Sequence, residues 1–392
     1  MNALRTAPPP AVRSRLPQVG TTIFSVMSAL AQQHDAVNLG QGFPDFGCDP
    51  RLIDAVERAM RAGHNQYAPM PGVAALRERL AEKIAALHGR AYDPGQEITI
   101  TAGATQAVFT ALLAFTQPGD EVIVLEPAFD SYAPGIALVG ARMVRVALDA
   151  DFRPDFDALA AAITPRTRLI LTNTPHNPSG TIWSAQDLDR LHALLAPTDI
   201  LLLSDEVYEH MVYDGRAHAS AAGHPGLAAR SVVISSFGKT YHVTGWKIGS
   251  VAAPAELSAE FRKVHQFNVF AVSSAVQQGL AEHLRDPAPY RELSAFYQAK
   301  RDRFRDGLAA TPLRLRPCEG SYFQVVDYGG LRPELAALDE EALARWMTRE
   351  IGVTAIPMSA FYADGRQRQQ IRFCFAKRDD TLDRALDRLA RL

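Results

Sequence analysis

Short apolar runs alternate with longer amphipathic segments between residues 97 and 254, and this alternation restricts the fold more than any other feature. The segments 103–116, 153–163 and 184–196 are long enough to form helices that cross between parallel strands. The pattern predicts an α/β fold in which a mostly parallel sheet is buried between helices. The strand-like runs are EITIT (97–101), DEVIVLEP (120–127), RMVRVAL (142–148), TRLILTNTP (167–175), ILLLSDE (200–206), SVVISSF (231–237) and IGSVAAP (248–254).

The pattern changes after about residue 285, where long helical segments mix with a few strand-like runs. This change predicts a smaller α+β domain, with helices over 288–310, 339–351 and 379–391. We therefore expect an N-terminal arm that joins the small domain (1–45), a large domain (46–285) and a small C-terminal domain (286–392). No G-x-G-x-x-G follows the early strands, which argues against a dinucleotide-binding dehydrogenase.

Composition excludes several classes of function. A net charge of −2 argues against nucleic-acid binding, which needs a dense basic surface. Three widely spaced cysteines form neither a disulfide framework nor a metal-binding pair, which indicates a reducing compartment, the cytoplasm, and no metal site. We also expect the first 17 residues to be a loose arm and no segment to cross a membrane.

Lysine is rare in this chain. Only six of the 41 lysine and arginine residues are lysines, and two of them lie close together in SSFGKTYHVTGWKIG, residues 235–249. Arginine stays protonated at any working pH, whereas a lysine amine can lose its proton and become a nucleophile. Lys239 and Lys247 therefore invite a chemical interpretation, although the count alone leaves two ordinary surface charges equally open.

Polar residues follow several of the predicted strands, at the edge where ligands of open α/β sheets bind. TAGATQ places Gly103, Ala104 and Thr105 at a strand-to-helix turn, where backbone N–H groups favour a phosphate, although an ordinary capped turn also explains them. SDEVY places Asp205 at the end of an apolar strand. Because a buried, unpaired carboxylate is costly, Asp205 should have a cationic partner or a capping role.

Two further strand ends carry candidate residues. NTPHNPSG includes Asn173 and Asn177, whose amides offer directed hydrogen bonds, although the prolines and glycine suit a plain turn as well. His176 in the same loop is more often a structural residue than a catalyst. Phe129 in EPAFDSY is, taken alone, more often a core residue.

Together, TAGATQ, NTPHNPSG, SDEVY, SSFGKTYHVTGWK and IRFCFAK resemble the fold-type I, pyridoxal-phosphate-dependent aminotransferases in type and order. The sequence is most similar to the branch of bacterial methionine aminotransferases and kynurenine aminotransferases. The similarity extends from LPQVGTTIF and NLGQGFPDF near the start to IRFCFAKRDDTL near the end. It implies the α/β fold described above, with a large cofactor-binding domain and a smaller α+β domain.

The resemblance implies a role for each motif residue. Lys239 would bond the cofactor and then move the substrate proton. Asp205 would pair with the pyridine nitrogen of the cofactor. Tyr208 and Asn177 would bind its phenolic oxygen, and Phe129 would stack on its ring. The residues implied at the cofactor phosphate are Gly103, Ala104, Thr105, Ser236, Lys247 and Tyr67, the last from a partner subunit of a homodimer.

The substrates implied are an amino acid and a 2-oxo acid. Arg372 would clamp the substrate carboxylate with Asn177 nearby, and Gly40 would lie beside the substrate. Phe24 and Phe270 suggest a pocket for an uncharged side chain, as do Phe361 and Tyr322. Some kynurenine-directed relatives carry Phe-His where this chain has Phe270 and Ala271, which weakens the case for kynurenine.

The motifs leave alternatives open. We expect an aminotransferase for methionine or a large neutral L-amino acid, but a kynurenine aminotransferase or a cysteine-conjugate β-lyase of the same fold shares the motifs. Stoichiometric conversion of the cofactor to its pyridoxamine form would identify a transaminase, whereas release of pyruvate and ammonia without an acceptor would identify a lyase. A transcription regulator of this fold would need an added DNA-binding domain.

Overall fold

The predicted strand runs form one sheet in the computed structural model, which describes residues 12–392. Most of the arm predicted for residues 1–17 therefore lies outside the described residues. The order of the seven strands across the sheet is β2-β8-β7-β6-β5-β3-β4. Their bounds are β2 (Ile98–Thr101), β3 (Glu121–Glu126), β4 (Arg142–Ala147), β5 (Thr167–Asn173), β6 (Leu201–Asp205), β7 (Ser231–Ser236) and β8 (Gly249–Ala252).

Strand direction gathers the carboxyl ends of most strands at one edge. β3, β4, β5, β6 and β7 are parallel, whereas β8 is antiparallel to both β7 and β2. The apolar residues 122–125 of β3 are all buried, as are Leu202 and Leu203 of β6, as expected for strands covered on both faces. The polar residues that follow β2, β5, β6 and β7 consequently meet at the same edge.

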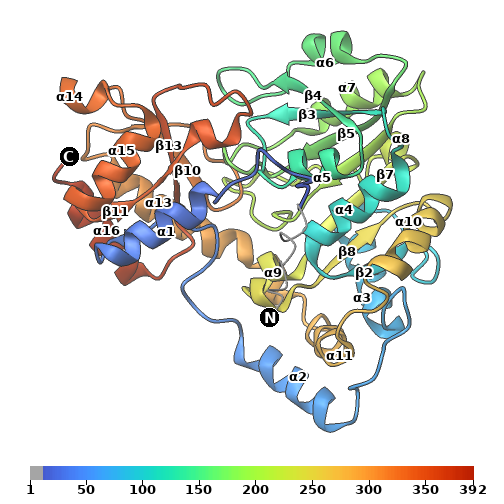
Figure 1. Cartoon of the computed structure of the whole chain (residues 1–392). Helices are drawn as coiled ribbons and strands as arrows, with labels where there is room; N and C mark the ends of the chain where they lie inside the picture. Colours follow the sequence, from blue (N-terminus) through green and yellow to red (C-terminus); the bar gives the residue numbers. More distant parts are fainter. Residues whose placement is uncertain (1–11) are drawn as a thin grey trace, which may run out of the picture.

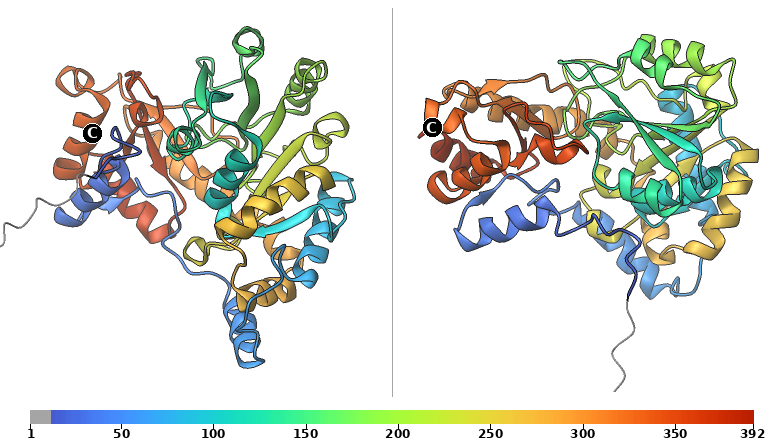
Figure 2. Two further views of the ribbon diagram at one scale, coloured as in Figure 1. Left: turned by 45° about the vertical axis from the view of Figure 1, so that its right-hand side comes forward. Right: turned by 45° about the horizontal axis from the view of Figure 1, so that its top comes forward.

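Helices cover both faces of this sheet (Figures 1 and 2). The predicted crossover helices are present, and α7 begins with a capping box in which Ser184 and Asp187 cap each other's backbone N–H groups. The helices of this part are α2 (Pro50–Arg61), α3 (Ala74–His88), α4 (Gly103–Phe115), α5 (Tyr132–Leu138), α6 (Phe156–Ala162), α7 (Ala185–Leu195), α8 (Pro225–Ala228), α9 (Phe237–Thr240), α10 (Ala255–Asn268) and α11 (Ser274–His283), with the 3₁₀ turn η1 (Thr244–Trp246).

The C-terminal part is built on a second sheet of order β12-β13-β10-β9. The predicted helix over 288–310 is divided at Glu292, and the one over 339–351 ends in a π turn. The strands are β9 (Arg314–Leu315), β10 (Phe323–Asp327), β11 (Val353–Thr354), β12 (Ile356–Pro357) and β13 (Gln370–Cys374). The helices are α12 (Ala288–Arg291), α13 (Leu293–Leu308), α14 (Pro333–Ala336), α15 (Glu340–Trp346), η2 (Met347–Ile351), η3 (Met358–Phe361) and α16 (Asp379–Leu389).

The N-terminal segment returns to this C-terminal part. β1 (Val37–Asn38) pairs in parallel with β11, and α1 (Ile23–Gln33) contacts β11, β12 and η2 (Figure 1). The chain then crosses to the large sheet through residues 40–47. The domain boundaries near 45 and 285 stay predictions. No helix within residues 12–392 is both long and apolar enough to cross a bilayer.

Candidate active site

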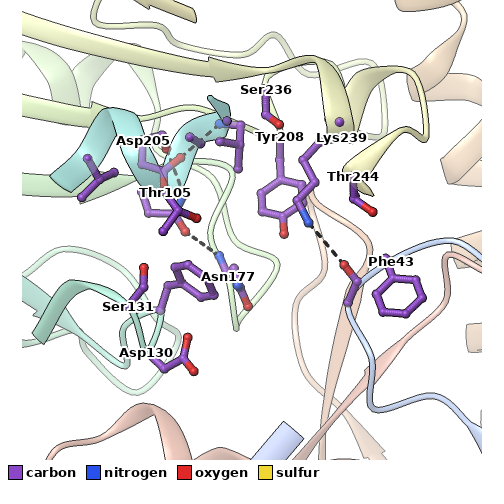
Figure 3. Close-up of a pocket in the computed structure, with 18 of the residues that line it drawn as sticks. Phe43, Thr105, Asp130, Ser131, Asn177, Asp205, Tyr208, Ser236, Lys239 and Thr244 are labelled. Carbon is purple, nitrogen blue, oxygen red and sulfur yellow. Dashed lines mark hydrogen bonds between the residues drawn. The ribbon is translucent and has the colours of Figure 1, made fainter. Parts of the chain in front are cut away.

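A cavity of about 540 Å³ lies at the carboxyl edge of the large sheet, and residues of the small sheet and the N-terminal segment close it. We call it the central cavity (Figure 3). Twelve of the predicted site residues line it: Phe24, Gly103, Ala104, Thr105, Phe129, Asn177, Asp205, Tyr208, Ser236, Lys239, Lys247 and Arg372.

Lys239 lies in the single turn of α9, directly after β7, and its amine points across the central cavity. The amine Nζ donates to the phenolic oxygen of Tyr322 at 2.9 Å and to the carbonyl of Gly42 at 3.3 Å. Burial lowers the pKa of this amine to about 8. A large share of the amine is therefore neutral, and nucleophilic, at mildly alkaline pH.

Asp205 ends β6 as a buried carboxylate. Tyr132 Oη donates to Asp205 Oδ2 at 2.6 Å, and the N–H of Val207 donates to Oδ1 at 3.3 Å. No basic side chain within residues 12–392 forms an ion pair with it, and burial raises its pKa to about 6. Such a carboxylate suits a cationic N–H group on a bound molecule.

The start of α4 forms one end of the cavity and is suited to an anion. Its N-cap residue, Ala102, supplies no side-chain hydrogen bond, and Gly103 adopts a left-handed φ of 79°. A Cβ built on Gly103 would stand 3.4 Å from Nζ of Lys247, so the glycine lets the ammonium approach the helix N-terminus. Ser236 and Thr105 add hydroxyl groups. This set of donors fits a phosphate.

Arg372 is a buried guanidinium contributed by β13. Nη1 donates to Oδ1 of Asn177 at 2.6 Å and Nη2 donates to the carbonyl of Gly40 at 3.2 Å, whereas Nε has no partner among the described residues. Phe323 lies 3.9 Å and Phe361 4.8 Å from the guanidinium carbon, measured to the ring centres. Burial lowers the pKa of Arg372 to about 10. A carboxylate of a bound molecule would supply the missing counter-charge.

The loop after β5 is held by its own side chains. Asn173 accepts from the N–H of Asn177 at 2.8 Å and donates to the carbonyl of Asp205 at 2.9 Å. His176 bonds Ser179 and the Pro127 carbonyl, and burial lowers its pKa to about 4. His176 is therefore a neutral structural residue, while Asn177 is fixed with its amide at the cavity.

Two aromatic residues complete the walls near Asp205. Phe129 lines one face of the cavity and packs edge-on against Tyr132, with ring centres 5.7 Å apart. Tyr208 is buried beside Lys239, whose amine lies 5.6 Å from the centre of the Tyr208 ring. Burial raises the pKa of Tyr208, so its hydroxyl stays protonated and can donate.

Five of the predicted residues do not line the central cavity of their own chain: Gly40, Tyr67, Phe270, Tyr322 and Phe361. Gly40 contributes only its carbonyl to Arg372, and a Cβ on Gly40 would meet Ile356 at 3.0 Å. Tyr67 is 83% exposed and packs edge-on against Phe270, with ring centres 5.3 Å apart. Both rings lie on an exposed surface, away from the cavity wall. Their roles stay predictions that depend on a partner subunit.

Sequence reasoning missed several residues of the cavity. Tyr132, Asp130 and Ser131 lie in the EPAFDSY motif, of which only Phe129 was predicted to face the site. Gln41, Gly42 and Phe43 follow NLG, where only Gly40 was selected. A signal existed in both cases, because these residues adjoin a selected one. The orientation of their side chains toward the cavity could not be predicted, because it depends on contacts between segments that are distant in the sequence.

The geometry agrees with what comparison with known proteins finds. A family model described as aminotransferase class I and II matches residues 34–389. The methionine aminotransferase of Escherichia coli (strain K12) is 49% identical over 382 residues, which cover 97% of this chain and 98% of that protein. A probable N-succinyldiaminopimelate aminotransferase of Mycobacterium tuberculosis (strain ATCC 25618 / H37Rv) is 41% identical and covers 96% of this chain and 97% of its own.

A solved structure gives the same result for the fold. A protein of Escherichia coli, described with a methionine aminotransferase function, superimposes with a TM-score of 0.95 at 48% identity, over 98% of this chain and 100% of that chain. The predicted resemblance to class I/II aminotransferases and the predicted mixed α/β fold of type I are confirmed. Members of this family use pyridoxal phosphate.

The lowered pKa of Lys239 yields a prediction for the cofactor-free protein. Below pH 8 the amine is mostly protonated and unreactive, and above pH 8 it is mostly neutral, so its acylation rate should rise through a midpoint near pH 8. The rate is measured by mass spectrometry of the peptide containing Lys239, with exposed Lys263 as internal reference. A midpoint above pH 10 would contradict the burial of this amine.

Proposed function

This chain belongs to the aminotransferase class I and II family, and we propose that it moves the amino group of methionine, or of another large neutral L-amino acid, to a 2-oxo acid. The observation that carries the proposal is Arg372, a buried guanidinium that faces the central cavity together with Lys239. A carboxylate held by Arg372 would bring the α-carbon of an amino acid near the amine of Lys239.

The donor set of the cavity fits pyridoxal phosphate. Asp205 lacks a cationic partner within residues 12–392 and would pair with the protonated ring nitrogen. Tyr208 and Asn177 would donate to the phenolic oxygen, and Phe129 would cover the ring. The phosphate would lie at the uncapped start of α4, with Ser236, Thr105 and Lys247.

Each of the main residues of the cavity has a separate role in the proposed reaction. The bound cofactor supplies an electron sink that makes the substrate α-proton acidic. Lys239 removes that proton from the α-carbon, and its lowered pKa brings the base close to working pH. Arg372 fixes the carboxylate and hence the direction of the Cα–H bond. Asp205 keeps the cofactor ring protonated, with Tyr132 holding the carboxylate in place.

The walls of the cavity favour a neutral substrate side chain. Its lining includes the rings of Phe24, Phe43, Phe129 and Phe323. The cations along it are Lys239, Lys247 and Arg372, each already assigned, so none remains for the carboxylate of an acidic side chain. Asp130, a carboxyl group whose pKa is raised by burial, lies on the same wall and offers no attraction to an acidic side chain.

An exposed aromatic pair outside the cavity supports a homodimer with shared sites. Tyr67 and Phe270 form an exposed aromatic pair, and exposed Phe267 lies close to Phe270 in sequence. In a dimer, Tyr67 would reach the phosphate of the partner subunit and Phe270 the substrate.

We also propose a cytoplasmic location, because Cys48, Cys318 and Cys374 are all unpaired, which suits a reducing compartment.

The substrate proposal predicts an order of donors. Methionine extends beyond alanine by about three heavy atoms, which at ~0.8 kcal/mol per buried group is worth ~2.4 kcal/mol, or roughly fifty-fold in kcat/KM. Steady-state kinetics with a fixed 2-oxo acid should rank methionine first, phenylalanine and tyrosine next, and alanine and aspartate last, with kynurenine included as a further donor. Lys239→Ala serves as the inactive control.

Aspartate as the best donor would contradict the assignment of the pocket. Release of pyruvate and ammonia from a cysteine conjugate, without any 2-oxo acid and faster than transfer, would instead support the lyase alternative. Because one relative is named for an N-succinylated, acidic substrate, the same assay includes N-succinyldiaminopimelate.

The dimer proposal predicts complementation between inactive variants. A Lys239→Ala chain mixed with a Tyr67→Ala chain should form heterodimers with one intact site, and activity should rise above that of either parent. The matched control mixes Lys239→Ala with Asp205→Ala chains. These residues come from the same chain, so no heterodimer site is complete. No rescue in the first mixture, despite verified subunit exchange, would place Tyr67 outside the partner's site.

A further inference from the structure

Tyr322 lies on the turn between β9 and β10 and is completely buried. Its ring is held by other rings, with centres 5.1 Å from Tyr208, 5.7 Å from Tyr297 and 4.9 Å from Phe323. The phenolic oxygen therefore has a fixed position beside the central cavity.

The hydroxyl of Tyr322 forms two hydrogen bonds with defined directions. Oη donates its single proton to the carbonyl of Gly42 at 2.6 Å. Because that proton is used, Oη can only accept from Lys239, whose Nζ lies 2.9 Å away. The Gly42 carbonyl also accepts from Nζ at 3.3 Å, and Figure 3 shows the amine directed to this segment.

This arrangement matches what a lysine base needs. A neutral amine has two N–H bonds and one lone pair. The two acceptors can engage both N–H bonds, which leaves the lone pair without a donor and free to take a proton. If Tyr322 donated to the amine instead, the lone pair would be occupied. The bond to Gly42 prevents that orientation of the hydroxyl.

We propose that Tyr322 is a positioning residue that holds the amine of Lys239, whenever it is free of the cofactor, with its lone pair available to the substrate α-proton. The catalytic consequence rests on the proposed transamination. Tyr322 also ties the lysine to the segment 40–43, which carries the Gly40 carbonyl bonded to Arg372. Lys239 and Arg372 are thus both held by the segment 40–43.

Other charges act on the same amine and must be kept constant in a test. Burial is the largest influence on the pKa of this amine; the carboxylate of Asp205 favours the protonated form, whereas Arg372 and Lys247 oppose it. An accepting oxygen also favours the protonated form. Removing Oη should consequently lower the pKa of Lys239 from about 8.

Tyr322→Phe keeps the ring and removes only the oxygen. The matched control is Tyr328→Phe, which removes a buried hydroxyl that donates to Leu338 at 2.9 Å, outside the cavity lining. In Tyr322→Phe holoenzyme, kcat for methionine should fall about ten- to hundredfold with KM nearly unchanged. The isotope effect of α-deuterated methionine on kcat should increase, because proton transfer becomes slower. Tyr328→Phe should change neither.

A second readout needs no cofactor. In cofactor-free Tyr322→Phe, acylation of Lys239 at pH 7, relative to its plateau at pH 10, should be about threefold to fivefold faster than in the unchanged protein. Tyr322→His, which restores a ring acceptor, should recover part of kcat. If Tyr322→Phe fails to fold, Tyr322→Leu, which also lacks the oxygen, replaces it in both measurements.

An unchanged isotope effect together with an unchanged acylation profile would overturn the proposal. A changed acylation profile in a protein that does not transaminate would instead contradict the proposed function while leaving the positioning of Lys239 by Tyr322 intact.

Discussion

Two buried charges without protein counter-charges govern this structure. The carboxylate of Asp205 and the guanidinium of Arg372 are both removed from water, and neither forms an ion pair within residues 12–392. Burying such a charge without a counter-charge costs roughly several kcal/mol of folding free energy, unless a bound molecule supplies the opposite charge. Neutral donors and acceptors, Tyr132 for Asp205 and Asn177 for Arg372, fix their directions without neutralising them. The cavity is thereby prepared for a ligand with a cationic N–H group and a carboxylate.

The fold explains how these groups meet. Parallel strands bring Asn177, Asp205 and Lys239 to one edge of the large sheet, although they lie far apart in the sequence. Arg372 arrives from β13 of the small sheet, and the segment after β1 joins it through the Gly40 carbonyl. The site is therefore a junction of three segments, and a shift of any one would change the distance between base and clamp.

The sequence predicted the parts of this site that depend on local pattern. The apolar strand runs, the polar strand ends and the rare lysines were visible without a structure, so Asp205, Asn177 and Lys239 could be selected. The family resemblance added roles, which spacing alone could not supply. The antiparallel direction of β8 was not predicted, because an apolar run has no intrinsic direction.

Contacts across the fold could not be predicted. Tyr132 and Asp205 are 73 positions apart, and Tyr322 and Gly42 are 280 apart, so nothing local indicates either hydrogen bond. The resemblance named Tyr322 only as part of an apolar pocket, while its hydroxyl is bonded to the lysine amine. Phe270 was expected beside the substrate, yet in the single chain it lies on an exposed face with Tyr67.

We propose that Lys239, and not the neighbouring Lys247, bonds pyridoxal phosphate in this cavity. Borohydride reduction of the protein supplied with pyridoxal phosphate makes the linkage permanent, and mass spectrometry of the digest locates it. We expect a phosphopyridoxyl group on Lys239, which Lys239→Arg abolishes and Lys247→Arg retains. A label on Lys247 alone, or labelling unaffected by Lys239→Arg, would contradict it.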